Sequence, residues 1–152
     1  MVDFLFDDFF SVESLNPNGE KFDKVSRIVA QSEKHGMLMH LDVNTEIYPM
    51  KKGDRFLMVL SPSLNWDGAP VTSYEKQVEQ KSLLDKFEYI MHGLVYNLAE
   101  DGSGSEFKVG IYASFGGLQM LLKGDPSCCT EFKRDQKLFL LVRKVPHNFV
   151  RE

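Results

Sequence analysis

The side chains best suited to acid–base or metal chemistry are few in this sequence and lie far apart. His40 and Asp42 stand two residues apart, so they would share one face of a strand and form a candidate ligand or proton-transfer pair. His92 is the next side chain that an enzyme would recruit to them. A solvated polar strand face accounts for the same spacing without any chemistry, and we favour this second interpretation.

Other motifs of catalysis and metal binding are missing or have structural explanations. Asp7 and Asp8 are adjacent on an expected strand, so their carboxylates point to opposite faces and cannot act together at one site. Cys128 and Cys129 are neighbours, which suits neither a disulfide nor a metal site and predicts reduced thiols. Asp125 precedes a proline and predicts a turn. From these motifs we assign no catalytic residue, no metal ligand and no cofactor.

A pair of glycines, Gly116 and Gly117, separates two apolar runs in the stretch YASFGGLQMLLKGD at 112–125. A phosphate-binding loop would need Gly-Lys-Ser/Thr before a helix, whereas Leu-Gln-Met follows here in the alternation of a strand. A two-residue hairpin turn needs positive φ, which glycine adopts freely. The apolar pairs that such a hairpin would place on one face are Ile111 with Leu122, Ala113 with Met120, and Phe115 with Leu118. The pattern predicts a hairpin turn rather than a phosphate site.

Strand signals dominate the rest of the chain, because apolar and polar residues alternate with a period of two. Turn chemistry such as Asn-Pro-Asn-Gly at 16–19 separates these segments. The expected strands cover 4–12, 21–32, the stretch from 37 up to Pro49, 55–61, 87–98, 107–115, 118–123 and 137–145. In the third of them, the odd positions from Met37 to Ile47 should face inward. Eight short strands predict an all-β, antiparallel, closed barrel, whose corners suit Gly93 and Gly110.

One long polar segment, residues 62–86, interrupts this pattern and contains two prolines. We expect an irregular loop there, with a short helix over 73–86 as the alternative. Trp66 lies inside it and suits either a partner contact or the packing of the loop itself.

Composition limits the classes of protein to which this chain can belong. Its 152 residues and 43% hydrophobic content fit a single soluble domain spanning 1–152. There is no apolar run of the roughly 20 residues that a membrane helix needs, so no membrane partner is expected. The net charge of −4 argues against a protein whose main task is to grip nucleic acid.

Several segments of the chain, taken together and in order, resemble a known family. These segments are LFDDFF, KFDKVSRI, MHLDVNTEIYP, KFEYIMHGLVY, YASFGGLQMLLKGD and LFLLVRK. They are similar to the eighth-subunit family, the small common subunit shared by the eukaryotic nuclear DNA-directed RNA polymerases I, II and III. The likeness covers most of residues 4–144 and is weakest over 62–86 and 145–152.

This resemblance implies a fold, a location and a partner. It implies an eight-stranded barrel of the OB-fold type, a nuclear location, and a non-catalytic subunit that docks on the largest polymerase subunit and meets DNA or RNA only indirectly or weakly. It also implies a docking neighbourhood around the glycine pair, comprising Phe115, Gly116, Gly117, Leu118 and Met120. The same residues have a sufficient role as a structural hairpin, so both interpretations remain open.

Two further hypotheses compete with the assembly subunit. The first is a free-standing barrel that binds single-stranded nucleic acid by stacking bases on Tyr48, Tyr89, Tyr96 and Tyr112. The second is an enzyme with a pocket at the barrel mouth, built on the two histidines and the aspartate named first. The acidic net charge disfavours the former, and the lack of a catalytic motif disfavours the latter.

Overall fold

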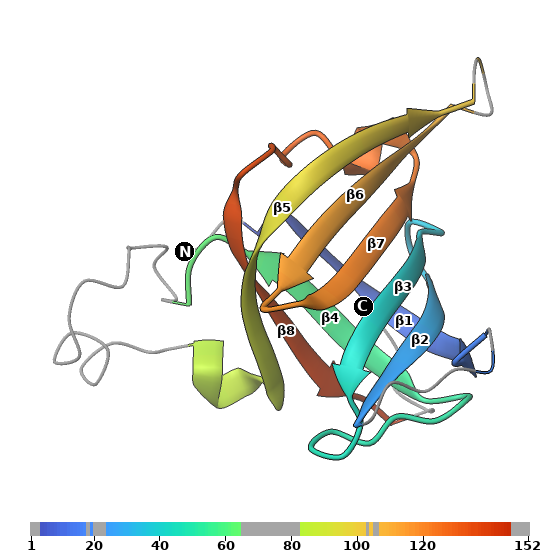
Figure 1. Ribbon diagram of the computed structural model, residues 1–152, viewed down its shortest axis with the longest axis vertical. Helices are drawn as coiled ribbons and strands as arrows, with labels where there is room; N and C mark the ends of the chain where they lie inside the picture. Colours follow the sequence, from blue (N-terminus) through green and yellow to red (C-terminus); the bar gives the residue numbers. More distant parts are fainter. Residues whose placement is uncertain are drawn as a thin grey trace, which may run out of the picture.

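A computed structural model describes residues 4–17, 19, 24–64, 83–102, 104 and 107–146. Its strands are β1 Phe6–Leu15, β2 Val25–Ser32, β3 Leu38–Asn44, β4 Arg55–Ser61, β5 Tyr89–Asp101, β6 Lys108–Phe115, β7 Leu118–Gly124 and β8 Lys137–Lys144. Two short 3₁₀ turns accompany them, η1 Leu83–Lys86 and η3 Pro126–Cys128. The strands form one closed barrel in the order β1-β2-β3-β7-β6-β5-β8-β4, visible in Figure 1. The predicted all-β, eight-stranded antiparallel barrel is therefore confirmed.

The interior of the barrel holds the main apolar core. Phe10 and Phe56 stack there with ring centroids 5.6 Å apart. The largest side chains that are fully buried are Phe10, Phe56, Ile28, Met37, Met39, Leu41, Met58, Leu60, Ile111, Met120 and Leu122. Burial of each such side chain contributes roughly 1.5–3 kcal/mol relative to exposure, so this interior supplies most of the folding energy.

β4 and β8 are covered on both faces, which suits the apolar run at 56–60 of β4. Their inward side chains join the main core, while Val59 and Leu141 form a second apolar cluster on the outer side. The partly buried side chains around that second cluster are Phe4, Leu57, Leu64, Phe87, Ile90 and Phe139.

β3 is shorter than expected. Its odd positions from Met39 to Val43 do point into the core, but Ile47 is 72% exposed. The strand ends at Asn44 because this residue nucleates a turn: its carbonyl accepts hydrogen bonds from the backbone N–H groups of Ile47 and Tyr48. The expected inward position of Ile47 is therefore wrong, since the alternation stops before it.

β1 and β5 extend beyond their expected ends, and each contains a register shift. β1 continues to Leu15 with a shift between Val12 and Ser14, and β5 reaches Asp101 with a shift between Val95 and Asn97. An extra residue lets a long strand bend around the barrel without losing its ladder. Sequence alternation ends at such a shift, which explains the early predicted ends.

The connections agree with the turn chemistry of the sequence where the structure describes them. The Asp125 side chain accepts a hydrogen bond from Ser127 N and caps η3, which confirms the predicted turn. Of the alternative helix over 73–86, only η1 is seen; its remainder and Trp66 lie outside the described residues. No helix in the described part of the chain is long and apolar enough to cross a membrane.

Candidate docking face

The glycine pair turns the β6–β7 hairpin, as predicted. Gly116 and Gly117 have φ values of 64° and 104°, and Ser114 Oγ accepts a hydrogen bond of 3.2 Å from Gly117 N. The observed register joins Phe115 with Leu118 and continues to the expected pairs further along the ladder. Positive φ at both central residues requires glycine here, because L side chains are strained in that region.

The structure places the five residues of the expected docking neighbourhood at three depths. Phe115 and Met120 lie inside the barrel, with 5% and 1% of their surface exposed. Leu118 is half-buried against the core, and the two glycines are exposed at the tip. A partner can therefore reach the tip and the rim of Leu118, whereas the other two side chains support the hairpin from within.

Apolar side chains gather on the outer surface of the strands next to this tip. Of the four large apolar side chains exposed in the described residues, Leu94 at 39% and Tyr96 at 46% lie on this surface, whereas Leu38 at 36% pairs with Lys123 at the opposite end of β7. Leu94 is paired with Ser114 on β6, and Ser114 and Tyr112 are paired with Gln119 and Leu121 on β7. We call this surface the outer face and define it by Leu94, Tyr96, Tyr112, Gln119 and Leu121. Its exposed apolar side chains make it a candidate protein interaction site.

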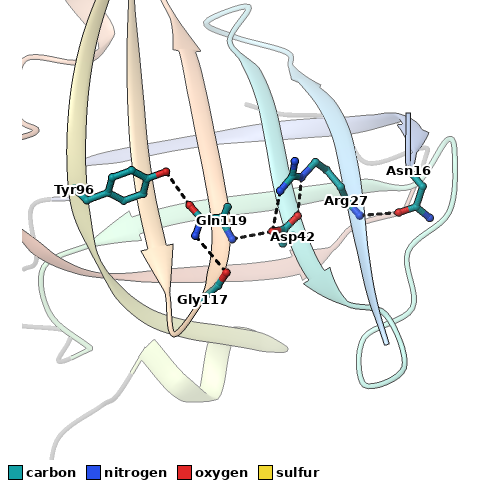
Figure 2. Close-up of polar contacts among 6 residues, drawn as sticks. All are labelled: Asn16, Arg27, Asp42, Tyr96, Gly117 and Gln119. Atoms are coloured by element: carbon teal, nitrogen blue, oxygen red, sulfur yellow. Dashed lines mark hydrogen bonds and ion pairs between the residues drawn. The ribbon is translucent and has the colours of Figure 1, made fainter. Parts of the chain in front are cut away.

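A chain of polar contacts holds the outer face to the tip (Figure 2). Tyr96 donates its hydroxyl to Gln119 Oε1 at 2.8 Å, and Gln119 Nε2 donates to the carbonyl of Gly117 at 3.3 Å. The backbone N–H of Gln119 donates to Asp42 Oδ2 at 3.0 Å. These contacts fix the side chain of Gln119 and the hydroxyl of Tyr96 in the free chain.

Asp42 is also held by Arg27, so both of its carboxylate oxygens are engaged in hydrogen bonds. Arg27 Nε and Nη2 donate to the two carboxylate oxygens at 2.8 Å and 3.1 Å. The hydrogen bond to Asp42 raises the pKa of Arg27, and the guanidinium stays charged. Arg27 N in turn donates to Asn16 Oδ1 at 3.0 Å, which extends the network to the β1–β2 connection. The side chains of this network position one another.

A hollow of about 230 Å³ lies on this face, with apolar and polar walls. Its lining residues are Arg27, His40, Tyr96, Tyr112, Gln119, Met120 and Leu121. The cavity suits one inserted side chain of a partner better than a reaction, because the carboxylate beside it is already paired.

The three side chains of the enzyme hypothesis do not converge. His40 lines the hollow on β3, while His92 lies on β5 and stacks on Phe139 with centroids 4.5 Å apart. β7 and β6 stand between β3 and β5 in the barrel. In the described ranges, no group of three His, Cys, Asp or Glu side chains is arranged to hold a metal ion.

The four tyrosines of the nucleic-acid hypothesis form two separate pairs. Tyr48 and Tyr89 stack on each other with centroids 5.1 Å apart, and the Tyr48 hydroxyl donates to Glu88. Burial raises the pKa of Tyr48, and this hydrogen bond lowers the pKa of Glu88. Tyr96 and Tyr112 lie on the outer face, with centroids 6.2 Å apart. The rings therefore do not form one continuous stacking track.

Sequence reasoning missed several members of the outer face. The sequence does not single out Leu94, because the stretch Gly93-Leu94-Val95-Tyr96 shows no clear alternation of apolar and polar residues. The network of Arg27, Asp42 and Gln119 joins residues from three strands, and no local spacing reveals it. Only the predicted register of the barrel could have indicated these residues, because it assigns the outward positions of β7.

Comparisons with known proteins identify relatives of this chain. The family model described as RNA polymerase Rpb8 matches residues 7–144. An Arabidopsis thaliana protein named "DNA-directed RNA polymerases II, IV and V subunit 8B" is 51% identical, covering 93% of this chain and 96% of its own length. A Dictyostelium discoideum protein named "DNA-directed RNA polymerases I, II, and III subunit rpabc3" is 42% identical over 95% of this chain and 99% of its own.

More distant matches extend the comparison. A Saccharomyces cerevisiae protein named "DNA-directed RNA polymerases I, II, and III subunit RPABC3" is 31% identical over 95% of this chain and all of its own length. Among solved structures, the cytoplasmic molybdate-binding protein ModG aligns over 90% of this chain and 89% of its own, with 11% identity and a TM-score of 0.31. That last likeness is too weak to bear on function.

Proposed function

Because this chain belongs to the RNA polymerase Rpb8 family, we propose that it is a non-catalytic common subunit of the nuclear DNA-directed RNA polymerases I, II and III. The observation that carries the proposal is the match of residues 7–144 to that family, together with relatives that align over nearly their whole length. The protein then acts in the nucleus, where it supports the assembly and stability of the polymerase, while other subunits supply the catalysis.

We propose that the chain docks on the largest polymerase subunit through the outer face and the adjoining hairpin tip. The exposed Leu94 and Tyr96 supply apolar contact area, and the polar network beneath them keeps their neighbours fixed. Gly116 and Gly117 let a partner backbone approach the tip closely, because they carry no side chain. Phe115 and Met120 contribute from inside by holding the hairpin in place.

The set of polymerases served by the chain is part of the proposal. The relatives from Dictyostelium and yeast are named for polymerases I, II and III, whereas the Arabidopsis relative is named for II, IV and V. We favour the first set, which two of these three names share.

Single-stranded nucleic-acid binding receives less support. Among the described residues that line the hollow, Arg27 is the one guanidinium, and it is already paired with Asp42 and so less available to a phosphate. The net charge of −4 also opposes it.

Affinity purification of the tagged chain from nuclear extract tests the proposed function. We expect the wild-type chain to recover the largest subunits of polymerases I, II and III. A double variant, Leu94→Ser with Tyr96→Ser, should recover much less, whereas Asp7→Asn on the outer side of β1 should recover as much as the wild type. The proposal fails if the folded wild-type chain recovers no large polymerase subunit.

A further inference from the structure

Although the barrel is closed, β3 and β5 each extend beyond the glycine turn without a strand between them there. β6 ends at Phe115 and β7 begins at Leu118, but β5 pairs with β6 only from Leu94 onward and begins five residues earlier. On the other side, β3 pairs with β7 only as far as Leu41 and then continues to Asn44. Figure 1 shows both β5 and β3 running on past the turn that joins β6 and β7. We call this gap the notch; its edges are residues 42–44 and 89–93.

The β3 edge of the notch is already capped by the protein itself. Asn44 N donates to the hydroxyl of Tyr89 at 3.2 Å, so the side chain of the first residue of the β5 edge reaches across to it, and the Asn44 carbonyl accepts from the turn that follows. The backbone N–H of Gln119, which would otherwise face β3, donates to the carboxylate of Asp42. Side chains thus replace the missing ladder on this edge.

The β5 edge has a different pattern. Val95 N donates to Gln136 O at 2.9 Å, toward β8. In an antiparallel ladder the direction alternates, so the backbone N–H and C=O groups of Ile90 and His92 face away from β8 and toward the notch. Between residues 89 and 93, β5 is paired with β8 alone among the strands that the structure describes.

This edge also lacks the usual protection against strand addition. Exposed edges are normally blocked by charged residues, especially lysine, or by proline. Residues 89–93 read Tyr-Ile-Met-His-Gly and contain neither Lys, Arg, Asp, Glu nor Pro. Of their outward side chains, Ile90 packs on the cluster of Val59 and Leu141 and His92 stacks on Phe139, and Leu94 is exposed just above. A strand added at this edge could hydrogen-bond to the N–H and C=O groups of Ile90 and His92 and pack on apolar side chains.

We propose that an extended segment of the largest polymerase subunit adds to the barrel as a strand beside β5, bonding to the backbone of Ile90 and His92. The segment continues the line of β6 below the glycine turn and places apolar, uncharged side chains beside Ile90 and Leu94. Strand addition of this kind takes its affinity from main-chain hydrogen bonds and its specificity from alternate side chains. The inference rests on the proposed function, which supplies this partner chain in preference to a second copy.

Hydrogen–deuterium exchange compares the free chain with the chain in purified polymerase. We expect the amides of Ile90 and His92 to exchange at least about tenfold more slowly in the complex. The amides of Tyr89 and Met91, which face β8, should change much less. If the large subunits are recovered while the His92 amide exchanges as fast as in the free chain, the strand inference is overturned and the proposed function stands. If the protection instead appears in a dimer of the free chain, the occupant is a second copy and the inference is also overturned.

A matched pair of variants separates the backbone from the side chain. His92→Pro removes the N–H that faces the notch but none that faces β8, while His92→Ala keeps that N–H and removes only the ring. We expect His92→Pro to weaken incorporation into the polymerase about tenfold more than His92→Ala, with both isolated chains still folded by circular dichroism. Equal incorporation of the two variants would overturn the inference. If the proline variant does not fold, the exchange measurement on the wild type decides alone.

Discussion

The two faces of the β6–β7 hairpin share one ladder but have opposite environments. The inward face, with Ile111, Phe115 and Met120, is buried in the barrel. The outward face, with Tyr112 and Gln119, is partly open to solvent and tied by polar contacts. The contrast teaches that the glycine motif itself has a structural role, while the docking role we propose belongs to the outward face beside it. Substitutions on the first face should damage folding, and those on the second should damage assembly.

The largest loss of stability is expected from the inward face. Met120→Ala should lower the free energy of unfolding by about 2–5 kcal/mol, because it leaves a cavity among well-packed side chains. Urea denaturation of the isolated chain measures this loss. Leu121→Ala, one residue along and facing outward, is the matched control and should lose less than about 1.5 kcal/mol. Similar losses at the two positions would contradict the assignment of faces.

The next largest loss of stability is expected from the polar network of Arg27, Asp42 and Gln119. Asp42→Ala should cost about 2 kcal/mol, because it leaves the partly buried Gln119 N–H and the Arg27 guanidinium without their shared acceptor. Thermal and urea unfolding check this value. Asp101→Ala removes the partner of Lys123 from a pair in which the carboxylate is well exposed, and it should cause no measurable change. A neutral Asp42→Ala variant would show that the network does not hold β7 to β3.

The turn itself should be sensitive to side chains. Gly117→Val and Gly116→Val should each cost about 1–2 kcal/mol, since a β-branched residue resists positive φ. Gly110→Ala is the control: its added Cβ would approach only side-chain atoms, the nearest at 3.3 Å, so we expect a smaller effect. Melting temperatures that match the wild type for both valine variants would contradict the turn geometry.

The smallest expected effect is a dependence on pH at Glu88, next to the start of β5. Hydrogen bonds from Tyr48 and from Lys144 N hold the pKa of Glu88 below its ordinary value of 4.5. A lowered folded-state pKa gives stability that is present above 4.5 and is lost as the pH falls through the folded-state value. Glu88 is exposed, so this contribution is about 0.5 kcal/mol. Glu88→Gln should abolish it, seen as a smaller change in unfolding free energy between pH 7 and pH 3.

Local alternation predicted the eight strands and the register of the hairpin, because inward positions are apolar wherever a strand crosses the core. It failed at Ile47, where the Asn44 turn ends the strand, and at the bulge of β5, where alternation shifts. The outer face was hidden for a different reason. Arg27 is brought to the strands of Gln119 and Leu94 by the pairing of β3 with β7, which are far apart in the sequence, so this arrangement is a property of the topology and not of any short stretch.

Site-specific photo-cross-linking tests the central claim, that the outer face docks on the largest polymerase subunit. A photoreactive residue replaces Leu94 in one chain and Asp7, on the outer side of β1, in another. After incorporation into the polymerase and irradiation, we predict that position 94 cross-links to the largest subunit in high yield and that position 7 does not. A cross-link to that subunit from position 7 alone would contradict the account.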